Sequence, residues 1–141
     1  MARDFSTLAD STARSPLGRH LNWQADRIEE DHARFRMPFA EHNVTVGDMV
    51  HGGAISALAD AAATAACWAT PEADPSRSRG ATVALNVNFL KAALGVDLLA
   101  DARVVQRGGS VCVADVEVRT DAGELIAVAR ATYKLSHRPR P

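Results

Sequence analysis

A single carboxylate stands in the middle of an apolar stretch. Residues 50 to 66 read VHGGAISALADAAATAA, and Asp60 is the only acidic residue among them. Burying a carboxylate without compensation costs several kcal/mol, so Asp60 must be hydrogen-bonded, paired or protonated. On a helix, Ser56, Asp60 and Thr64 would share one face, because they stand four residues apart. Thr64 is then one candidate donor to the carboxylate, which could serve catalysis or a structural hydrogen bond to a neighbouring loop.

The same stretch opens with a histidine and two glycines. The first N–H groups of a helix have no intrahelical acceptor, and Gly52 and Gly53 would let a ligand come close to them. Together with the helix dipole, these groups can hold a negative oxygen. Asp60 lies about two turns further along, at roughly 1.5 Å per residue. A carbonyl held at the glycines would therefore meet this carboxylate only if the two came from different copies of the chain, or if the substrate reached along the groove.

The hydrophobic pattern predicts the elements that position these groups. Residues 52 to 69 are apolar on every side, which predicts a helix enclosed by the rest of the fold. A period of two over residues 32 to 39 and 82 to 90 predicts half-buried strands, whereas EHNVTVGDM between strand and helix is interpreted as a loop. Three more strands are expected at residues 98 to 106, 111 to 119 and 124 to 135, joined by the turn sequences RGGS and DAG.

One apolar helix and about six strands indicate an α+β domain, with a curved antiparallel sheet around the helix. The alternation in the strand at residues 82 to 90 predicts that Val83, Leu85, Val87 and Phe89 share one face, opposite Thr82, Ala84, Asn86 and Asn88. Near the N-terminus, Ser6 and Thr7 could cap a short helix.

Composition argues against several classes of protein. The 16 basic and 17 acidic residues nearly balance, which disfavours nucleic acid or an anionic membrane as the main partner. No apolar run approaches the roughly 20 residues of a membrane-spanning helix, and no signal-peptide pattern is present, so we expect a cytoplasmic protein. Cys67 and Cys112 lack the spacing of a zinc or redox site and are expected in the core. No other His or Cys stands at metal-ligand spacing from His51, so no metal is expected.

The sequence VHGGAISALAD followed by AAATAA closely resembles the motif of the hotdog-fold thioesterases, in particular the branch typified by the phenylacetic-acid-degradation thioesterase. The match consists of His-Gly-Gly and an Asp nine residues after the His, on an alanine-rich helix. The resemblance implies a hotdog fold, assembled as homodimers or homotetramers with active sites between subunits. It extends over about residues 18 to 135, leaving residues 1 to 17 as an N-terminal segment and 136 to 141 as a tail.

The resemblance implies an acyl-CoA thioesterase for aromatic or short to medium acyl groups that needs no cofactor. Asp60 would act as nucleophile or as general base on water, and Gly52, with Gly53, would polarise the thioester carbonyl through backbone N–H groups. Three further residues would lie at the site: Thr64 to place the water, Thr82 at a position where relatives have a hydroxyl, and His51 at the entrance.

The sequence departs from the family at one position. Members commonly place an Asn or Gln six residues before the His to orient the water or the carboxylate, but that position holds Thr45 here. The nearest amide is Asn43, two residues earlier. Either the loop contains an insertion, which Gly47 would permit, and Asn43 takes the role, or Thr45 replaces the amide, or the activity is weak.

Coenzyme A carries phosphates that need cations, and the acyl pocket should be lined by the helix and by residues 82 to 90. Asn86 and Asn88 on that strand are candidate substrate-binding residues, although they could equally be exposed strand residues. Candidate cations, each of which could equally be a solvated surface charge, are Lys91, Arg107, Arg77 and Arg79.

Two alternatives remain open. A hotdog hydratase or dehydratase needs a His beside the acyl α-carbon, and a histidine before glycines together with a mid-helix Asp fits hydrolysis better. A non-catalytic acyl-CoA-binding regulator would normally carry a DNA-binding segment, whereas the first thirty residues show no basic cluster or helix-turn-helix pattern.

Overall fold

The apolar stretch forms one long helix in the computed structural model, which describes residues 4–139. This helix, α3, spans Gly52–Trp68, and six of its nine buried residues are alanine, so neighbouring backbone can approach it closely. Its half-exposed side carries Ser56, Asp60 and Thr64, the polar stripe that the spacing predicts. The polar stripe therefore lies on the side of α3 that the sheet does not fully bury.

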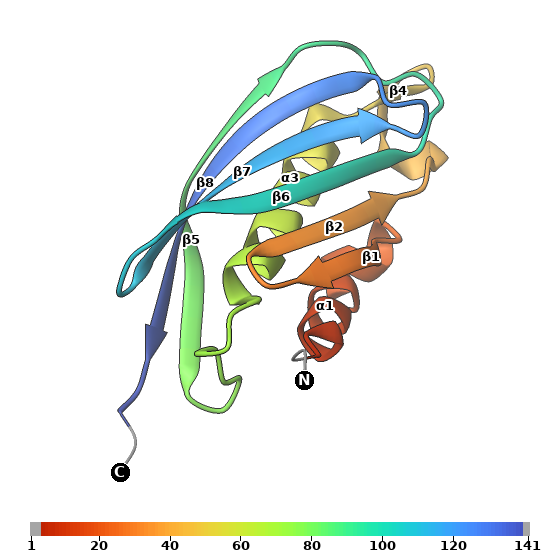
Figure 1. Ribbon diagram of the computed structural model, residues 1–141. Coiled ribbons are helices and arrows are strands. Elements are labelled where there is room, and N and C mark those ends of the chain that lie inside the picture. Colours follow the sequence, from red (N-terminus) through yellow and green to blue (C-terminus); the bar gives the residue numbers. More distant parts are fainter. Residues whose placement is uncertain (1–3, 140–141) are drawn as a thin grey trace.

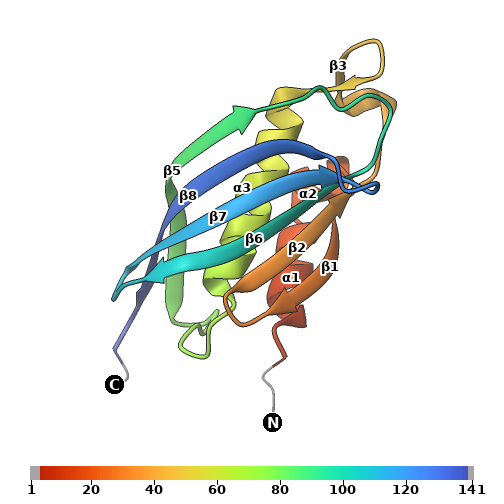
Figure 2. The ribbon, with the colours of Figure 1, turned by 45° about the horizontal axis from the view of Figure 1, so that its top comes forward.

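A six-stranded antiparallel sheet curves over α3 (Figures 1 and 2). The α+β class and the wrapped helix are thus confirmed. The strand β5 lies at one edge of the sheet, although it precedes β6, β7 and β8 in the chain. In spatial order the strands are β1 (Gln24–Glu29), β2 (His32–Met37), β6 (Leu98–Arg107), β7 (Val111–Thr120), β8 (Leu125–His137) and β5 (Ser78–Phe89).

Some elements were not predicted. The expected N-terminal helix is α1 (Ser6–Ala13), which contacts α3 and β1, but Ser6 and Thr7 do not cap it: its N-cap residue is Phe5, and no side chain makes a cap hydrogen bond. A second short helix, α2 (Pro16–His20), and the strand β1 follow it. The segment interpreted as a loop instead contains a 3₁₀ turn, η1 (Glu41–Asn43), and a hairpin of β3 (Val44–Val46) and β4 (Met49–Val50). The first three residues of the N-terminal segment and the last two of the tail lie outside the described residues.

The predicted faces of β5 are wrong at its start. Thr82 pairs with Tyr133 and Ala84 pairs with Thr132, so Val83 is an extra residue in a β-bulge and is 65% exposed. The bulge shifts the alternation by one residue. Thr82 therefore faces α3 together with Leu85, whereas strict alternation had placed the two residues on opposite faces.

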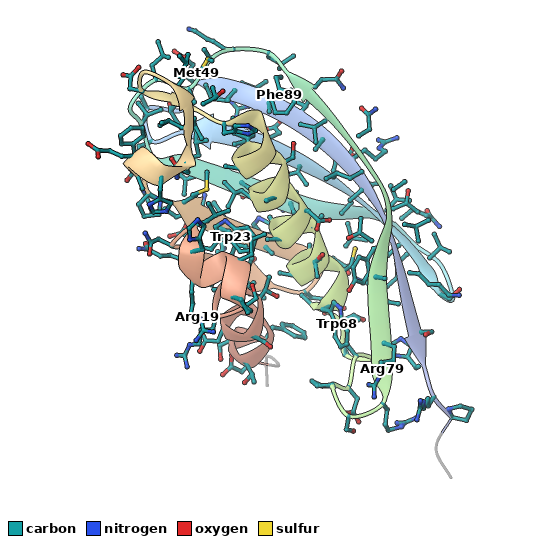
Figure 3. All side chains as sticks on the ribbon, turned by 180° about the vertical axis from the view of Figure 1, so that it is seen from behind. Arg19, Trp23, Met49, Trp68, Arg79 and Phe89 are labelled. Carbon is teal, nitrogen blue, oxygen red and sulfur yellow. The ribbon has the colours of Figure 1, made fainter. Side chains whose placement is uncertain are left out.

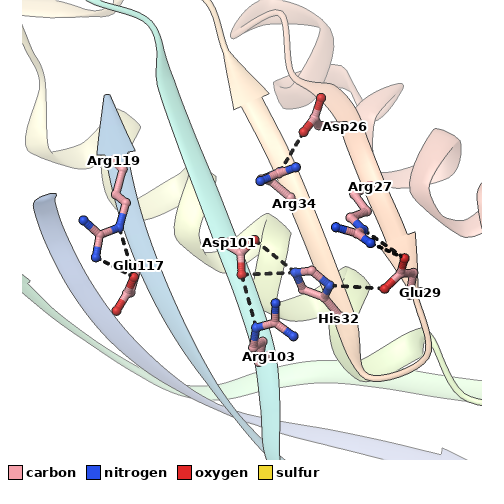
Figure 4. A network of polar contacts seen from close by, with 9 residues as sticks. All are labelled: Asp26, Arg27, Glu29, His32, Arg34, Asp101, Arg103, Glu117 and Arg119. Atoms are coloured by element: carbon pink, nitrogen blue, oxygen red, sulfur yellow. Dashed lines mark hydrogen bonds and ion pairs between the residues drawn. The ribbon is translucent and has the colours of Figure 1, made fainter. Parts of the chain in front are cut away.

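The outer face of the sheet, turned away from α3, carries a network of paired charges (Figure 4). His32 is only 4% exposed there, and its Nε2 lies 3.1 and 3.0 Å from the two carboxylate oxygens of Asp101. Its Nδ1 lies 3.7 Å from a carboxylate oxygen of Glu29, and Arg103 approaches Asp101 at 3.6 Å. This buried histidine is thus bonded to Asp101 through Nε2, whereas its Nδ1 has no hydrogen-bond partner among the described residues.

The two cysteines are free and buried in the core, as expected. The hydrogen bond between Cys67 and Cys112, together with burial, raises the pKa of the Cys67 thiol far above its ordinary value, so this thiol stays protonated. No helix within residues 4–139 is long and apolar enough to cross a membrane.

Candidate active site

The start of α3 leaves one backbone N–H group open. His51 is the N-cap residue; its Nδ1 accepts from the N–H of Gly53 at 2.8 Å, and its carbonyl accepts from Ala54 and Ile55 at 2.9 and 3.1 Å. Within residues 4–139, only Gly52 among the first four residues of α3 has an N–H group without an acceptor. The sequence predicts that the two glycines act together, but Nδ1 of His51 already accepts from the N–H group of Gly53. The helix dipole makes the remaining N–H group a good donor to a negative oxygen.

An apolar groove of about 350 Å³ opens beside this N–H group. The ring of Phe89 lies against Gly52: a Cβ atom at position 52 would stand 3.3 Å from its Cζ. Figure 3 shows Phe89 and Met49 together at this end of α3, far from Trp68 at the other end. The groove is lined by Thr45, Met49, Val50, Gly52, Ile55, Phe89, Leu90, Lys91, Ala92 and Ala93.

The carboxylate of Asp60 has one neutral partner. Thr82 donates a hydrogen bond from Oγ1 to Oδ1 of Asp60 at 2.7 Å, across the gap between α3 and the edge strand β5. No hydrogen bond joins Asp60 to Thr64, which lies one turn further along the same side of the described helix. The candidate donor from the helix is therefore replaced by one from the bulge of β5. No described residue donates to the second carboxylate oxygen, so this oxygen can receive a hydrogen bond from a water or a substrate.

A second hydroxyl lies beyond Thr82. Trp68 donates from its indole N–H to the hydroxyl of Tyr133 at 2.8 Å, and Tyr133 is the cross-strand neighbour of Thr82. Burial raises the pKa of Tyr133, so its hydroxyl keeps its proton. Gly80 makes room for the phenol, because a Cβ atom there would overlap its oxygen.

Asn43 lies at the base of the β3–β4 hairpin, next to the start of α3. Its carbonyl accepts from the N–H of His51 at 2.8 Å, and its side chain is buried, with 3% exposure. The amide Nδ2 makes only a long contact of 3.5 Å to the carbonyl of Pro38, and Oδ1 has no partner among the described residues. Thr45 lies on the exposed hairpin. The turn of the hairpin contains Gly47 with φ of 58°, a conformation that glycine adopts readily.

Comparison with known proteins decides the family. The family model described as Thioesterase superfamily matches residues 47–127, a segment that contains Gly52, Asp60 and Thr82. The chain belongs to the thioesterase superfamily. It is 38% identical over 126 residues to a provisionally named esterase of Halobacterium salinarum, covering 82% of this chain and 81% of that protein. It is 30% identical over 132 residues to the medium/long-chain acyl-CoA thioesterase YigI of Escherichia coli K12, covering 84% of each.

The fold agrees with this assignment. A thioesterase family protein from Silicibacter pomeroyi superimposes with a TM-score of 0.85 at 25% identity, covering 96% of this chain and 100% of that one. The hotdog fold and the prediction of a thioester hydrolase are therefore confirmed.

The structure of this thioesterase places the other candidates differently. Asn86 and Asn88 alternate with Leu85 and Val87, which pack on the core, so the two amides lie on the outer face and bond to each other at 3.1 Å. The side chains of Asn86 and Asn88 therefore do not reach the inner face of the sheet, where Asp60 lies. Lys91 lines the groove beside Gly52 and forms an exposed ion pair with Glu124 at 3.0 Å.

The arginine candidates are engaged elsewhere. Arg107 bonds to Asp31 at 2.7 and 3.0 Å and to the carbonyl of Cys67 at 3.0 Å, at the end of α3 opposite Gly52. A cation is favourable at that end, because the helix carbonyls there lack partners. Arg77 and Arg79 donate to the backbone carbonyls of Arg138 and Ser78. These are the contacts of the three arginines within the described chain, and their role toward coenzyme A stays a prediction.

Sequence reasoning missed Phe89 as a neighbour of Gly52, and the Trp68–Tyr133 pair. Phe89 is 37 positions from Gly52 in the chain, and its apolar character only marked it as part of a strand face. No local signal links residues so far apart, because the pairing of strands decides which of them meet.

Proposed function

We propose that this thioesterase hydrolyses acyl-CoA, with Asp60 as the catalytic carboxylate and the N–H group of Gly52 as the donor to the thioester carbonyl. The observation that carries the proposal is the pair of unfilled positions: one helix N–H group without an acceptor and one carboxylate oxygen without a donor. The similarity to YigI, named as a medium/long-chain acyl-CoA thioesterase, supports acyl-CoA as the substrate class.

The proposed chemistry needs no group beyond these. Asp60 removes a proton from a water molecule that attacks the thioester carbon, or it attacks this carbon itself and the acyl-enzyme is then hydrolysed. Both routes place negative charge on the carbonyl oxygen, where the N–H group of Gly52 and the dipole of α3 stabilise it. The hydroxyl of Thr82 holds Oδ1 of Asp60 and so aims the second carboxylate oxygen.

We further propose that each site is built from two copies of the chain. Gly52 and Asp60 are eight residues apart on α3, which separates them by about 12 Å at 1.5 Å per residue. A carbonyl and its attacking group must stand about 3 Å apart to react. Gly52 of one subunit therefore acts with the partner's Asp60.

The edge strand β5 offers a way to bring these halves together. Phe89 near its end contacts Gly52, and Thr82 near its start contacts Asp60. Antiparallel pairing with a second β5, about a two-fold axis near Leu85 and Asn86, would lay Phe89 beside the partner's Thr82. The same pairing would cover an edge that is open in the described chain, and open edges are usually covered.

We propose that Asn43, rather than Thr45, fills the amide position of the family. Two observations support this choice: the segment between Asn43 and His51 forms a hairpin that could hold the insertion this alternative requires, and Asn43 lies beside the helix start. An amide can accept and donate at once, so it can hold a water against a carboxylate.

The proposal is tested by measuring free thiol released from a panel of short, aromatic and medium- to long-chain acyl-CoAs, with Asp60→Asn as the matched control. We expect release by the natural chain and its near loss in the variant. A folded natural chain that releases no thiol from any member of the panel would overturn the proposed function.

A further inference from the structure

The groove beside Gly52 has the chemistry of an acyl-binding site. Of its ten lining residues, only Thr45 and Lys91 carry polar side chains, and Lys91 is already paired with Glu124 at the rim. The remainder present aliphatic or aromatic surface. A pantetheine arm carries amides that would find few partners here, whereas a hydrocarbon chain would lose apolar surface to the groove.

The wall formed by Phe89 is fixed by the sheet. Phe89 pairs with Ala127 of β8, and the next residue, Leu90, donates its N–H to the carbonyl of Ile126 at 2.8 Å. The ring is 52% exposed, yet it lies in contact with Gly52. The backbone that carries it cannot shift without breaking strand pairing.

The opposite wall is held equally firmly. Met49 of the hairpin forms a bridge with Leu94, and the N–H of Val50 donates to the carbonyl of Ala93 at 2.9 Å. The N–H of Gly95 donates to the carbonyl of Asp48, also at 2.9 Å. With both walls fixed, the width of the groove next to Gly52 is set by side chains, and Phe89 is the largest of them.

Resting on the proposed function, we infer that this groove binds the acyl chain and that Phe89 selects unbranched aliphatic acyl groups. A carbonyl held at the N–H group of Gly52 has its α-carbon next to the ring, because the ring lies only 3.3 Å from the position that a Cβ atom of residue 52 would take. A straight methylene chain is narrow enough to lie beside the ring of Phe89. A branch or an aromatic ring at the α-carbon is wider and collides with the ring of Phe89. Phe89 is thus a specificity-determining residue that discriminates at the first carbon of the acyl group.

The test compares Phe89→Ala with the natural chain on hexanoyl-CoA, its isomer 2-methylpentanoyl-CoA, and benzoyl-CoA. We expect the natural chain to prefer hexanoyl-CoA, and Phe89→Ala to reduce the ratio of kcat/KM for straight over branched substrate at least tenfold, within the range that one methyl group controls in an apolar pocket. Val105→Ala is the control, because Val105 is a half-exposed apolar residue outside the groove. It should leave the ratio unchanged.

A binding experiment tests this inference independently of the proposed chemistry. Dissociation constants for the same three compounds are measured on Asp60→Asn, with and without Phe89→Ala, so the result does not require turnover. A straight-chain preference that disappears with Phe89→Ala supports the inference, even if Asp60 has another role. An unchanged ratio would overturn it. If Phe89→Ala instead weakened the binding of all three compounds and of free coenzyme A equally, the inference would also be overturned. The groove would then be assigned to the coenzyme A arm.

Discussion

Two polar groups in this protein face opposite sides of the same sheet and have very different partners. On the outer face, His32 contacts Asp101 and lies near Glu29, both of which are charged (Figure 4). On the inner side, Asp60 receives one hydrogen bond, from the neutral hydroxyl of Thr82. His32 is almost fully buried, whereas the side of α3 that carries Asp60 is half exposed.

On the proposed function, this difference separates a structural polar group, His32, from a reactive one, Asp60. His32 is held through Nε2 by Asp101, and a buried group held in this way contributes to the stability of one conformation, because breaking the contact leaves it unpaired. A carboxylate with one oxygen held and one oxygen open keeps its capacity to accept a proton or to attack. We therefore expect changes on the inner side to affect turnover, and changes on the outer face to affect stability.

The largest effect is expected from Asp60→Asn. The amide can still accept the hydrogen bond of Thr82 but cannot act as base or nucleophile, so kcat should fall by about 10² to 10⁴. The fold should persist, because the shape of the side chain is kept. Thiol release and a thermal melt measure the two quantities. Near-normal turnover in a folded variant would remove Asp60 from the mechanism.

A smaller effect is expected at the base of the hairpin. Asn43→Ala should lower kcat/KM on the best acyl-CoA by more than tenfold, or about 1.4 kcal/mol, because it removes the amide proposed to orient the water. Thr45→Ala is the matched control and should stay within a few-fold of the natural chain, with melting temperatures recorded for both. The reverse pattern would show that a hydroxyl has replaced the amide.

The smallest effect on turnover is expected on the outer face. Asp101→Ala leaves Nε2 of the buried His32 without its acceptor, which should lower the free energy of unfolding by about 1 to 3 kcal/mol. Arg103→Ala removes only an exposed contact and should cost less than about 1 kcal/mol. Denaturant unfolding measures both, and kcat of the folded protein should not change. A large loss of kcat in Asp101→Ala would contradict the division between the two faces.

Local patterns in the sequence predicted the parts of the molecule that local patterns control. The all-round apolar character of residues 52 to 69 predicted α3, and the four-residue spacing predicted the stripe that contains Asp60. The resemblance to the family placed Thr82 at the site, but the alternation of the strand put it on the wrong face, because its contact with Asp60 depends on a bulge defined by the pairing of β5 with β8. The use of Gly53 by the side chain of His51 was missed for a different reason: a histidine is not among the preferred N-cap residues.

The most direct test of the account concerns its central claim, that Gly52 acts with the partner's Asp60. Gly52→Val should abolish activity, because the valine side chain would meet Phe89 and cover the N–H group. Asp60→Asn, made as a separate single variant, should also abolish activity. The two variants are produced together with different affinity tags, and the mixed dimer is isolated by both tags. In a two-fold dimer one of its two sites then carries both changes and the other carries neither, so about half of the natural turnover should return. A mixed dimer as inactive as its parents would show that both groups act within one chain, and would contradict the account.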